Sequence, residues 1–203
     1  SSSLAKIEKK LLEKADAVFV SAEKLLQSKR SGKAKTVLIR HGVDFDHFAS
    51  SLLPETVIPD EITSIPRPII GYFGLIADDW VDVPLLVHVA RSFPQTSLVL
   101  LGKVTMDISE LAKEPNVYIL GRKPYSTLPG YSKGFDIALI PFPVTEVTLN
   151  ANPLKAREYL ASGLPVVSTS IPEVEVLGEC FIGRNKEEFV AKIKDALNAP
   201  GPD

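Results

Sequence analysis

Residues 150–169 have the sequence N-A-N-P-L-K-A-R-E-Y-L-A-S-G-L-P-V-V-S-T, which carries the strongest fold signal in the chain. Asparagine is a preferred helix cap and proline suits the first helical position, so Asn152 and Pro153 predict that a helix begins here. Gly163 predicts a left-handed end to that helix, and residues 164–167 predict a buried strand that begins near its proline. A loop, a short helix and a buried strand in this order are typical of an α/β sheet.

Two charged residues of the predicted helix indicate a ligand. Lys155 falls in the first turn, where the helix macrodipole disfavours a cation. A positive side chain beside free amides at a helix start is a site for a phosphate-like anion. Glu158 lies on the same face, one turn later. The simpler alternative is that Lys155 and Glu158 form only a surface ion pair, worth roughly 0.2–0.5 kcal/mol.

From residue 69 onward, apolar runs of strand length alternate with helical segments. Strands are expected at 69–74, 97–102, 117–120, 135–141 and 165–169, with a weak one at 179–182, and helices at about 83–93, 107–112, 128–133, 153–162 and 187–198. This alternation predicts an α/β fold: a doubly wound, Rossmann-like parallel sheet with helices on both faces. Ligands of such sheets bind at the carboxyl ends of the strands, where the helix at 153–162 is expected to begin.

The first 48 residues show the same alternation on a smaller scale. An amphipathic helix is expected at 4–14, a strand at 17–20, a helix capped by Ser21, a strand at 36–40 and a helical turn at 45–48. Residues 49–68 hold several prolines and lose the periodicity, so they are expected to be a linker. The sequence therefore predicts three parts: 1–48, 49–68 and 69–203.

The composition excludes several classes of protein. With 24% charged and 45% hydrophobic residues and a net charge of −2, the 203-residue chain has the composition of an ordinary globular protein, with no electrostatic basis for binding nucleic acid. The single cysteine, Cys180, excludes an internal disulfide and fits a reducing compartment, and the scattered histidines predict no metal site. No apolar run approaches a membrane span, and the N-terminus lacks a signal-peptide core. A cytoplasmic protein is expected.

Four segments, in order, resemble the C-terminal, nucleotide-sugar-binding half of GT-B glycosyltransferases of the retaining family 4 (group 1) type. They are A-D-A-V-F-V-S-A-E-K-L (15–25) with V-L-I-R-H-G-V-D-F-D-H-F (37–48), I-I-G-Y-F-G (69–74), N-V-Y-I-L-G-R-K-P-Y-S-T-L-P-G-Y (116–131) and N-P-L-K-A-R-E-Y-L-A-S-G-L-P-V-V-S-T (152–169). The pattern also resembles a divergent subgroup associated with bacterial surface polysaccharide synthesis. On this resemblance, 1–48 is the end of an N-terminal domain, 49–68 the linker and 69–203 the donor-binding domain.

The resemblance implies a glycosyltransferase that takes its sugar from a nucleotide-diphospho-sugar, most simply a UDP-sugar. The acceptor would be a saccharide or a lipid-linked saccharide, and the full-length protein would associate with the inner face of the membrane. No metal or other cofactor is expected. The family reacts its substrates between two domains, and two such cores need roughly twice this length. The chain alone is therefore expected to bind donor without transferring sugar, with the catalytic groups in the missing part of the N-terminal domain.

The resemblance also implies which residues hold the donor. Gly74 would let the backbone approach the diphosphate, and Lys155 would contact phosphate, with Arg122 or Lys123 assisting. Arg122 and Lys123 are otherwise most simply solvated charges. Glu158 matches the second glutamate of the family's E-x7-E motif and would accept hydrogen bonds from the ribose hydroxyls. The full expected set is Gly74, Leu120, Gly121, Arg122, Tyr125, Asn150, Asn152, Pro153, Leu154, Lys155 and Glu158.

The sequence departs from the family pattern at two places. The first glutamate of the motif falls on Asn150, and the usual basic residues after the first strand are replaced by the loop 75–80. A non-catalytic nucleotide-sugar-binding module is therefore an alternative. A nicotinamide-dependent oxidoreductase would need G-x-G-x-x-G after the strand at 69–74, and the chain lacks it there. A CheY-like signalling domain would leave Lys155 and Glu158 as surface charges without a ligand.

Overall fold

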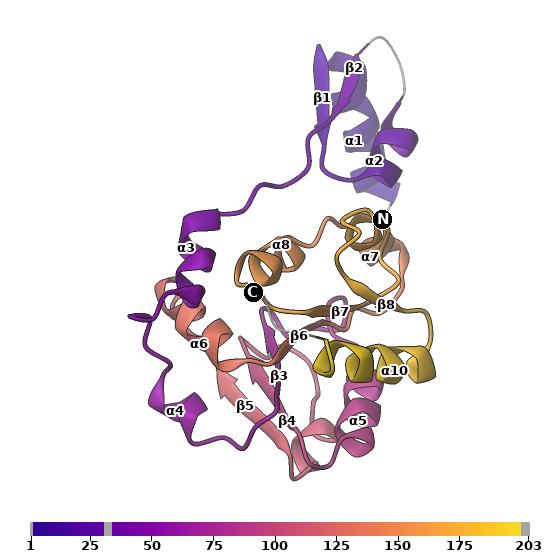
Figure 1. Ribbon diagram of the computed structural model, residues 1–203. Helices are drawn as coiled ribbons and strands as arrows, with labels where there is room; N and C mark the ends of the chain where they lie inside the picture. The colour runs from indigo at the N-terminus through magenta and orange to yellow at the C-terminus, as the bar shows by residue number, and fades with distance from the viewer. Residues whose placement is uncertain (1, 31–33, 200–203) are drawn as a thin grey trace.

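The computed structural model describes residues 2–30 and 34–199, and the chain forms two sheets, one of two strands and one of six. Figure 1 shows the smaller sheet and its helices standing beyond the end of the larger one. We call the described residues 2–30 and 34–40 the N-terminal unit, and residues 69–199 the sheet domain. No helix in the described part of the chain is long and apolar enough to cross a membrane.

The N-terminal unit has the predicted helix–strand–helix–strand order. Its elements are α1 (Ser2–Lys14), β1 (Ala17–Val20), α2 (Glu23–Lys29) and β2 (Lys35–Leu38), and the two strands are parallel. The predicted cap of α2 by Ser21 is wrong: the cap position is Ala22, and the Glu23 amide instead donates to Oε1 of Glu173, 2.7 Å away. Leu4, Ile7 and Leu11 on α1 are largely exposed.

The segment between the two units packs on the sheet domain. It contains α3 (Phe45–Ala49), a 3-10 turn η1 (Ser50–Leu52) and α4 (Asp60–Thr63). Phe48, Ser51, Ile62 and Ile65 are buried although the segment has no regular apolar periodicity. Figure 1 shows α3 and α4 along the flank of the sheet domain that carries α6. The predicted linker therefore lies along the sheet domain.

The six-stranded sheet is parallel throughout. Its order is β5 (Val117–Gly121), β4 (Ser97–Leu101), β3 (Ile69–Phe73), β6 (Ile137–Ile140), β7 (Val166–Thr169) and β8 (Phe181–Gly183). The chain first fills the β3–β4–β5 side and then returns to β6 on the other side of β3. The carboxyl ends of β3 and β6 therefore form the topological switch point, where sheets of this kind bind ligands.

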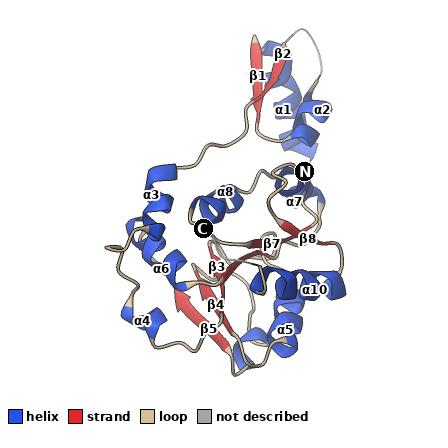
Figure 2. Cartoon of the chain, viewed as in Figure 1, coloured by secondary structure: helices blue, strands red, loops and turns tan. Residues whose placement is uncertain are grey.

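Helices cover both faces of the sheet, which confirms the predicted doubly wound fold (Figure 2). One face carries α5 (Val83–Ser92) and α10 (Lys186–Leu197), and the other carries α6 (Leu128–Gly134) and α8 (Leu154–Ala161). Because both faces are covered, β3, β4, β6 and β7 are buried along their whole length.

Short elements fill the connections and account for the differences from prediction. The helix expected at 107–112 is only the 3-10 turn η2 (Leu111–Lys113), and the loop expected at 142–151 contains α7 (Glu146–Leu149), which Thr145 caps. The turn expected at 171–174 is the short helix α9 (Pro172–Glu175), and η3 (Tyr125–Thr127) precedes α6.

Candidate functional site

Two glycines bring neighbouring backbones together at the switch point. Gly74 follows β3 with φ +143° and Gly102 follows β4 with φ +156°. A Cβ on Gly102 would lie 1.7 Å from the carbonyl oxygen of Gly74, so no other residue fits there without moving both strands. Gly102 was not predicted as a site residue. The sequence did contain a signal for it, because a glycine directly follows β4 just as Gly74 directly follows β3.

Lys155 lies directly over Gly74. A Cβ added to Gly74 would lie 2.0 Å from Cε and 2.6 Å from Nζ of this lysine. Nζ is 5.7 Å from the ring centroid of Tyr72 and 5.8 Å from that of Phe142, within reach of both aromatic faces. Burial lowers the pKa of Lys155, with Glu158 opposing the shift. Among the described residues, its ammonium has no hydrogen bond or ion pair, so it is free to meet an anion.

Glu158 follows one turn later on α8. The residue is only 7% exposed, yet within residues 2–30 and 34–199 its carboxylate has neither a hydrogen-bond nor an ion-pair partner. Burial raises the pKa of Glu158, while the neighbouring Lys155 and His47 oppose the rise. The surface ion pair of the alternative interpretation is therefore not formed. The carboxylate oxygens are not among the buried atoms without a partner in the described chain, so they reach solvent and can accept hydrogen bonds from the hydroxyls of a ligand.

The start of α8 differs from its prediction. The helix begins at Leu154 with Pro153 at the cap position, and no described side chain caps it. Asn152 is not the cap: its Oδ1 accepts a hydrogen bond from Nη1 of Arg157 and its Nδ2 donates to the Ser21 carbonyl, both at 2.6 Å. The first amides of α8 therefore remain available beside Lys155, in the positive end of the helix macrodipole. Gly163 ends the helix with φ +72°, as predicted.

Two hollows lie at this edge and share Leu75, and Lys155 lines the second of them. The first, which we call the β3–β5 hollow, has a volume of about 340 Å³ and is lined by Phe73, Gly74, Leu75, Leu101, Gly102, Lys103, Arg122, Lys123 and Leu128. The second, the α8 hollow, has a volume of about 210 Å³ and is lined by Leu75, Trp80, Phe142 and residues 151–155. Trp80 packs edge-on against Phe142, with ring centroids 5.3 Å apart.

The loop after β5 closes one side of the β3–β5 hollow. Leu120 and Gly121 end that strand, and the Gly121 carbonyl accepts the Gly102 amide at 2.8 Å. Arg122 is exposed and, in the described part of the chain, unpaired. Lys123 is not the solvated charge that we expected, because its ammonium lies 2.6 Å from Oε1 of Glu61 on α4, which also bonds Tyr131. That pair ties the loop to the linker.

Tyr125 is half exposed and lines neither hollow; burial raises its pKa, and so does the nearby charge of Glu158. Its ring stacks on that of His47, with centroids 4.6 Å apart and planes 16° apart, and His47 Nε2 is 3.1 Å from the Tyr125 carbonyl oxygen. His47 was not predicted as a site residue. It comes from α3, which packs on α8, and nothing in its local sequence signals that contact.

Asn150 lies apart from the other predicted residues. Its side-chain amide donates to the Glu146 carbonyl at 2.7 Å, and it lines a separate hollow together with residues of α2. The structure thus brings Gly74, Arg122 and residues 152–155 to the two hollows and Glu158 to the same helix face, while the Asn150 side chain is directed elsewhere.

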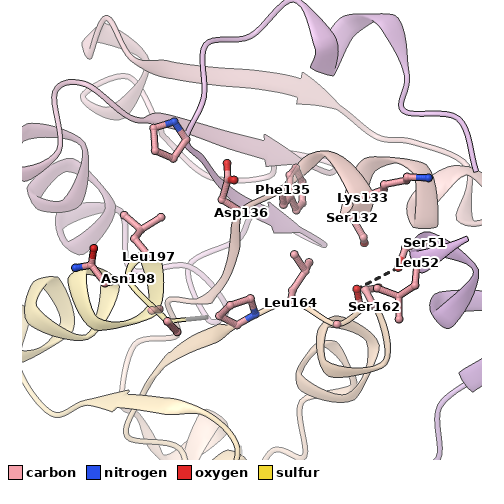
Figure 3. Close-up of a pocket in the computed structure, with 15 residues that line it drawn as sticks. Ser51, Leu52, Ser132, Lys133, Phe135, Asp136, Ser162, Leu164, Leu197 and Asn198 are labelled. Carbon is pink, nitrogen blue, oxygen red and sulfur yellow. Dashed lines mark hydrogen bonds between the residues drawn. The ribbon is translucent and has the colours of Figure 1, made fainter. Parts of the chain in front are cut away.

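A larger hollow, about 560 Å³, lies at the opposite edge of the sheet, where the strands begin (Figure 3). Its charged side chains are paired. Lys133 donates to the Leu53 carbonyl, Asp136 accepts from the Ile69 amide and from Arg67 at 2.5 Å each, and Ser51 donates to the Ser162 carbonyl at 3.1 Å. Of the buried side-chain polar atoms that the structure describes, only Ser132 Oγ has no partner.

Comparison with known proteins gives one family and a consistent fold. The family model described as "Glycosyl transferases group 1" matches residues 67–199. "Putative teichuronic acid biosynthesis glycosyltransferase TuaH" of Bacillus subtilis (strain 168) is 24% identical over 210 residues, which cover 97% of this chain and 52% of that protein. The chain therefore spans about half the length of this relative.

Solved structures share the fold at low sequence identity. Anabaena Alr3699/HepE, in complex with UDP and glucose, matches with a TM-score of 0.71 and 17% identity over 98% of this chain and 58% of that one. Sucrose-phosphate synthase from Thermosynechococcus elongatus matches with a TM-score of 0.70 and 20% identity, over 97% of this chain and 53% of that one. At these low identities, both similarities show a shared fold and nothing further.

Proposed function

The chain belongs to the glycosyl transferases group 1 family, and from that premise we propose that residues 69–199 bind the nucleotide-diphospho-sugar donor of a glycosyltransferase. A UDP-sugar is the first candidate, because HepE was solved in complex with UDP and with UDP-glucose. The name of TuaH, a putative teichuronic acid biosynthesis glycosyltransferase, supports a role in polysaccharide or glycoconjugate synthesis.

One observation carries the proposal: Lys155 and Glu158 are an oppositely charged, unpaired couple on one face of α8 at the switch point. A nucleoside diphosphate has a partner for each. Its phosphates match the ammonium of Lys155 and the uncapped amides at the start of α8. Its two vicinal ribose hydroxyls match the two oxygens of Glu158, which accept hydrogen bonds as a carboxylate.

The two hollows give the rest of the donor its places. The base would enter the β3–β5 hollow, whose apolar walls include Phe73, Leu101 and Leu128. The sugar would occupy the α8 hollow beside Lys155. Fixed amides and one lysine stabilise the charge of a departing diphosphate, so we expect no metal requirement.

The acceptor, a saccharide or lipid-linked saccharide, is proposed to enter from the N-terminal side. The exposed Leu4, Ile7 and Leu11 on α1 support a further part of an N-terminal domain covering that helix, since an apolar row of this kind is usually buried. The full protein is expected to act in the cytoplasm at the inner face of the membrane. The sheet domain without that partner would bind donor but not transfer sugar.

A non-catalytic nucleotide-sugar-binding module is the second candidate. Asn150 favours it, because this residue replaces the family's first glutamate and its amide is engaged with the Glu146 carbonyl. Sugar transfer by a protein that contains both domains would decide against this candidate.

Calorimetric titration with UDP, GDP and ADP tests the donor proposal, with uridine as the matched ligand that lacks phosphate. We expect UDP to bind and uridine to bind far more weakly, because the phosphate contacts are lost. Repeating the titration with UDP-sugars identifies the sugar. Binding of none of the three diphosphates, or a nucleotide seated at the amino edge of the sheet, would overturn the proposal.

A further inference from the structure

A single buried carboxylate of the sheet domain contacts two elements of the N-terminal unit. Glu173, on α9, is only 1% exposed. Its Oε1 accepts the amide of Glu23 at the start of α2, and its Oε2 accepts Nε of Arg40 just after β2, both at 2.7 Å. The sheet domain therefore contacts the N-terminal unit at the start of its second helix and at the exit from its second strand.

Glu173 supplies a contact that α2 lacks locally. No described side chain near in sequence caps this helix, and a carboxylate at a helix N-terminus is stabilised by the free amides and the macrodipole. The same carboxylate is paired with Arg40, and removing one partner of a buried pair is strongly destabilising. Glu173 is therefore a polar attachment between the two units, in addition to the more exposed ion pair of Lys24 with Glu146 at 4.0 Å.

Another contact between the units leads to the donor site. Asn152 donates to the Ser21 carbonyl in the N-terminal unit and accepts from Arg157 on α8. The same asparagine is 7% exposed and lines the α8 hollow next to Lys155. Arg157 lies within the field of Glu173, whose charge opposes the lowering of the Arg157 pKa by burial. The two contacts meet in the N-terminal unit, because Ser21 and Glu23 are only two residues apart at the beginning of α2, and the Asn152 contact reaches the lip of the proposed donor site.

We propose that Asn152, Arg157 and Glu173 form a latch through which an occupied donor site holds the N-terminal unit in place, with Glu173 as a positioning residue. The proposal rests on the donor site proposed above. A diphosphate bound at the start of α8 would fix residues 151–155, which include the Asn152 contact to Ser21. Binding then strengthens the latch, and by thermodynamic reciprocity the latch strengthens binding by the same factor.

Hydrogen exchange of the amides in β1 and α2 measures the latch, with and without saturating UDP, alongside a calorimetric UDP titration of each protein. Glu173→Gln removes the charge and keeps the shape. Glu114→Gln is the matched control, because it removes a carboxylate that pairs with Arg91 at 2.7 Å within the sheet domain. Arg40→Gln changes the same latch from its more exposed side, should Glu173→Gln fail to fold.

In the parent and in Glu114→Gln, UDP is expected to slow exchange in β1 and α2 by at least about fivefold, the lower end of ordinary coupling between sites. Glu173→Gln should lose that response and show a UDP Kd raised by the same factor, and Arg40→Gln should reduce both. Unchanged exchange in the parent despite calorimetric binding, or a full response in Glu173→Gln, would overturn the latch alone. Absence of UDP binding in the parent would overturn the donor proposal and the latch with it.

Discussion

The two edges of the six-stranded sheet both carry hollows, but they differ in how their charged groups are partnered. At the amino edge, the larger hollow of about 560 Å³ has Lys133 and Asp136 engaged by backbone groups and by Arg67. At the carboxyl edge, Lys155 lines the hollow of about 210 Å³ and lies over Gly74, which lines the hollow of about 340 Å³. Lys155 and Glu158, one turn later on α8, are unpaired within the described chain. The larger cavity is thus the electrostatically satisfied one.

This difference supports the proposal that the amino edge is structural and the carboxyl edge binds the donor. A buried charge that lacks a partner is unfavourable by several kcal/mol, whereas a paired one stabilises the strands that it joins. At the amino edge, Asp136 joins the start of β6 to the Ile69 amide of β3. At the carboxyl edge, Lys155 and Glu158 have no partner in the described chain, so both are open to a ligand that supplies opposite charge and hydrogen bonds. Cavity volume alone would have selected the amino edge.

The amino edge gives the largest expected change in stability. Asp136→Ala leaves the buried Ile69 amide and Arg67 without their carboxylate, and hydrogen bonds to a charged group are each worth about 1.5–3 kcal/mol. We expect the free energy of unfolding in urea to fall by about 2–4 kcal/mol. The UDP Kd, measured under native conditions, should remain within about twofold. A comparable loss of UDP affinity would mean that the two edges are not independent.

Glu158→Ala is the opposite experiment at the carboxyl edge. It should weaken UDP binding by about 1.5–3 kcal/mol, because the ribose hydroxyls lose a charged acceptor. The free energy of unfolding of the empty chain should stay the same or rise, since partial burial disfavours the charged carboxylate, which has no partner in the described chain. Calorimetry and urea unfolding of the same samples measure both quantities. Stability lost without affinity would make Glu158 a structural residue.

Lys155→Met tests the cation while keeping its packing over Tyr72 and Phe142. We expect UDP affinity to fall by about 1.5 kcal/mol, the lower end for a charged contact, while uridine affinity barely changes. Thermal unfolding of the empty variant should be unchanged or occur at higher temperature, because burial disfavours the ammonium. An equal loss for UDP and uridine would show that Lys155 shapes the site without contacting phosphate.

Much of this arrangement follows from local sequence. Periodicity predicts the strands and the doubly wound order, because each buried strand here is a short apolar run bounded by a glycine or proline. The places of Gly74 and Lys155 also follow from local sequence. Gly74 directly follows β3 and Lys155 lies in the first turn of α8, so both are expected at the carboxyl edge of the sheet. The family model and the sheet order confirm the fold, whereas the donor-binding roles stay predictions.

The residue roles that were predicted wrongly or not at all depend on long-range contacts. Asn152 has the local pattern of a cap, but its side chain bonds Ser21 and Arg157 instead. Lys123 was expected to be solvated, but it pairs with Glu61 on a linker helix 62 positions earlier. Glu173 caps a helix 150 positions away. Local propensity contains no information about partners that the tertiary fold brings together, so sequence patterns could not identify these residues.

The smallest expected effect is a pH dependence that has opposite signs for stability and for binding. Burial raises the pKa of Glu158 above its ordinary 4.5, so the empty folded chain binds more protons than the unfolded chain in the window between the two values. The free energy of unfolding should therefore decline as pH rises through that window. UDP affinity should change the other way, since the ribose hydroxyls need the carboxylate: it falls as pH drops through the raised pKa, by at most about tenfold per pH unit. Phosphate titration near pH 6 adds its own slope, and Glu158→Gln isolates it. Identical pH profiles for parent and Glu158→Gln would show that this carboxylate takes no part in binding the nucleotide.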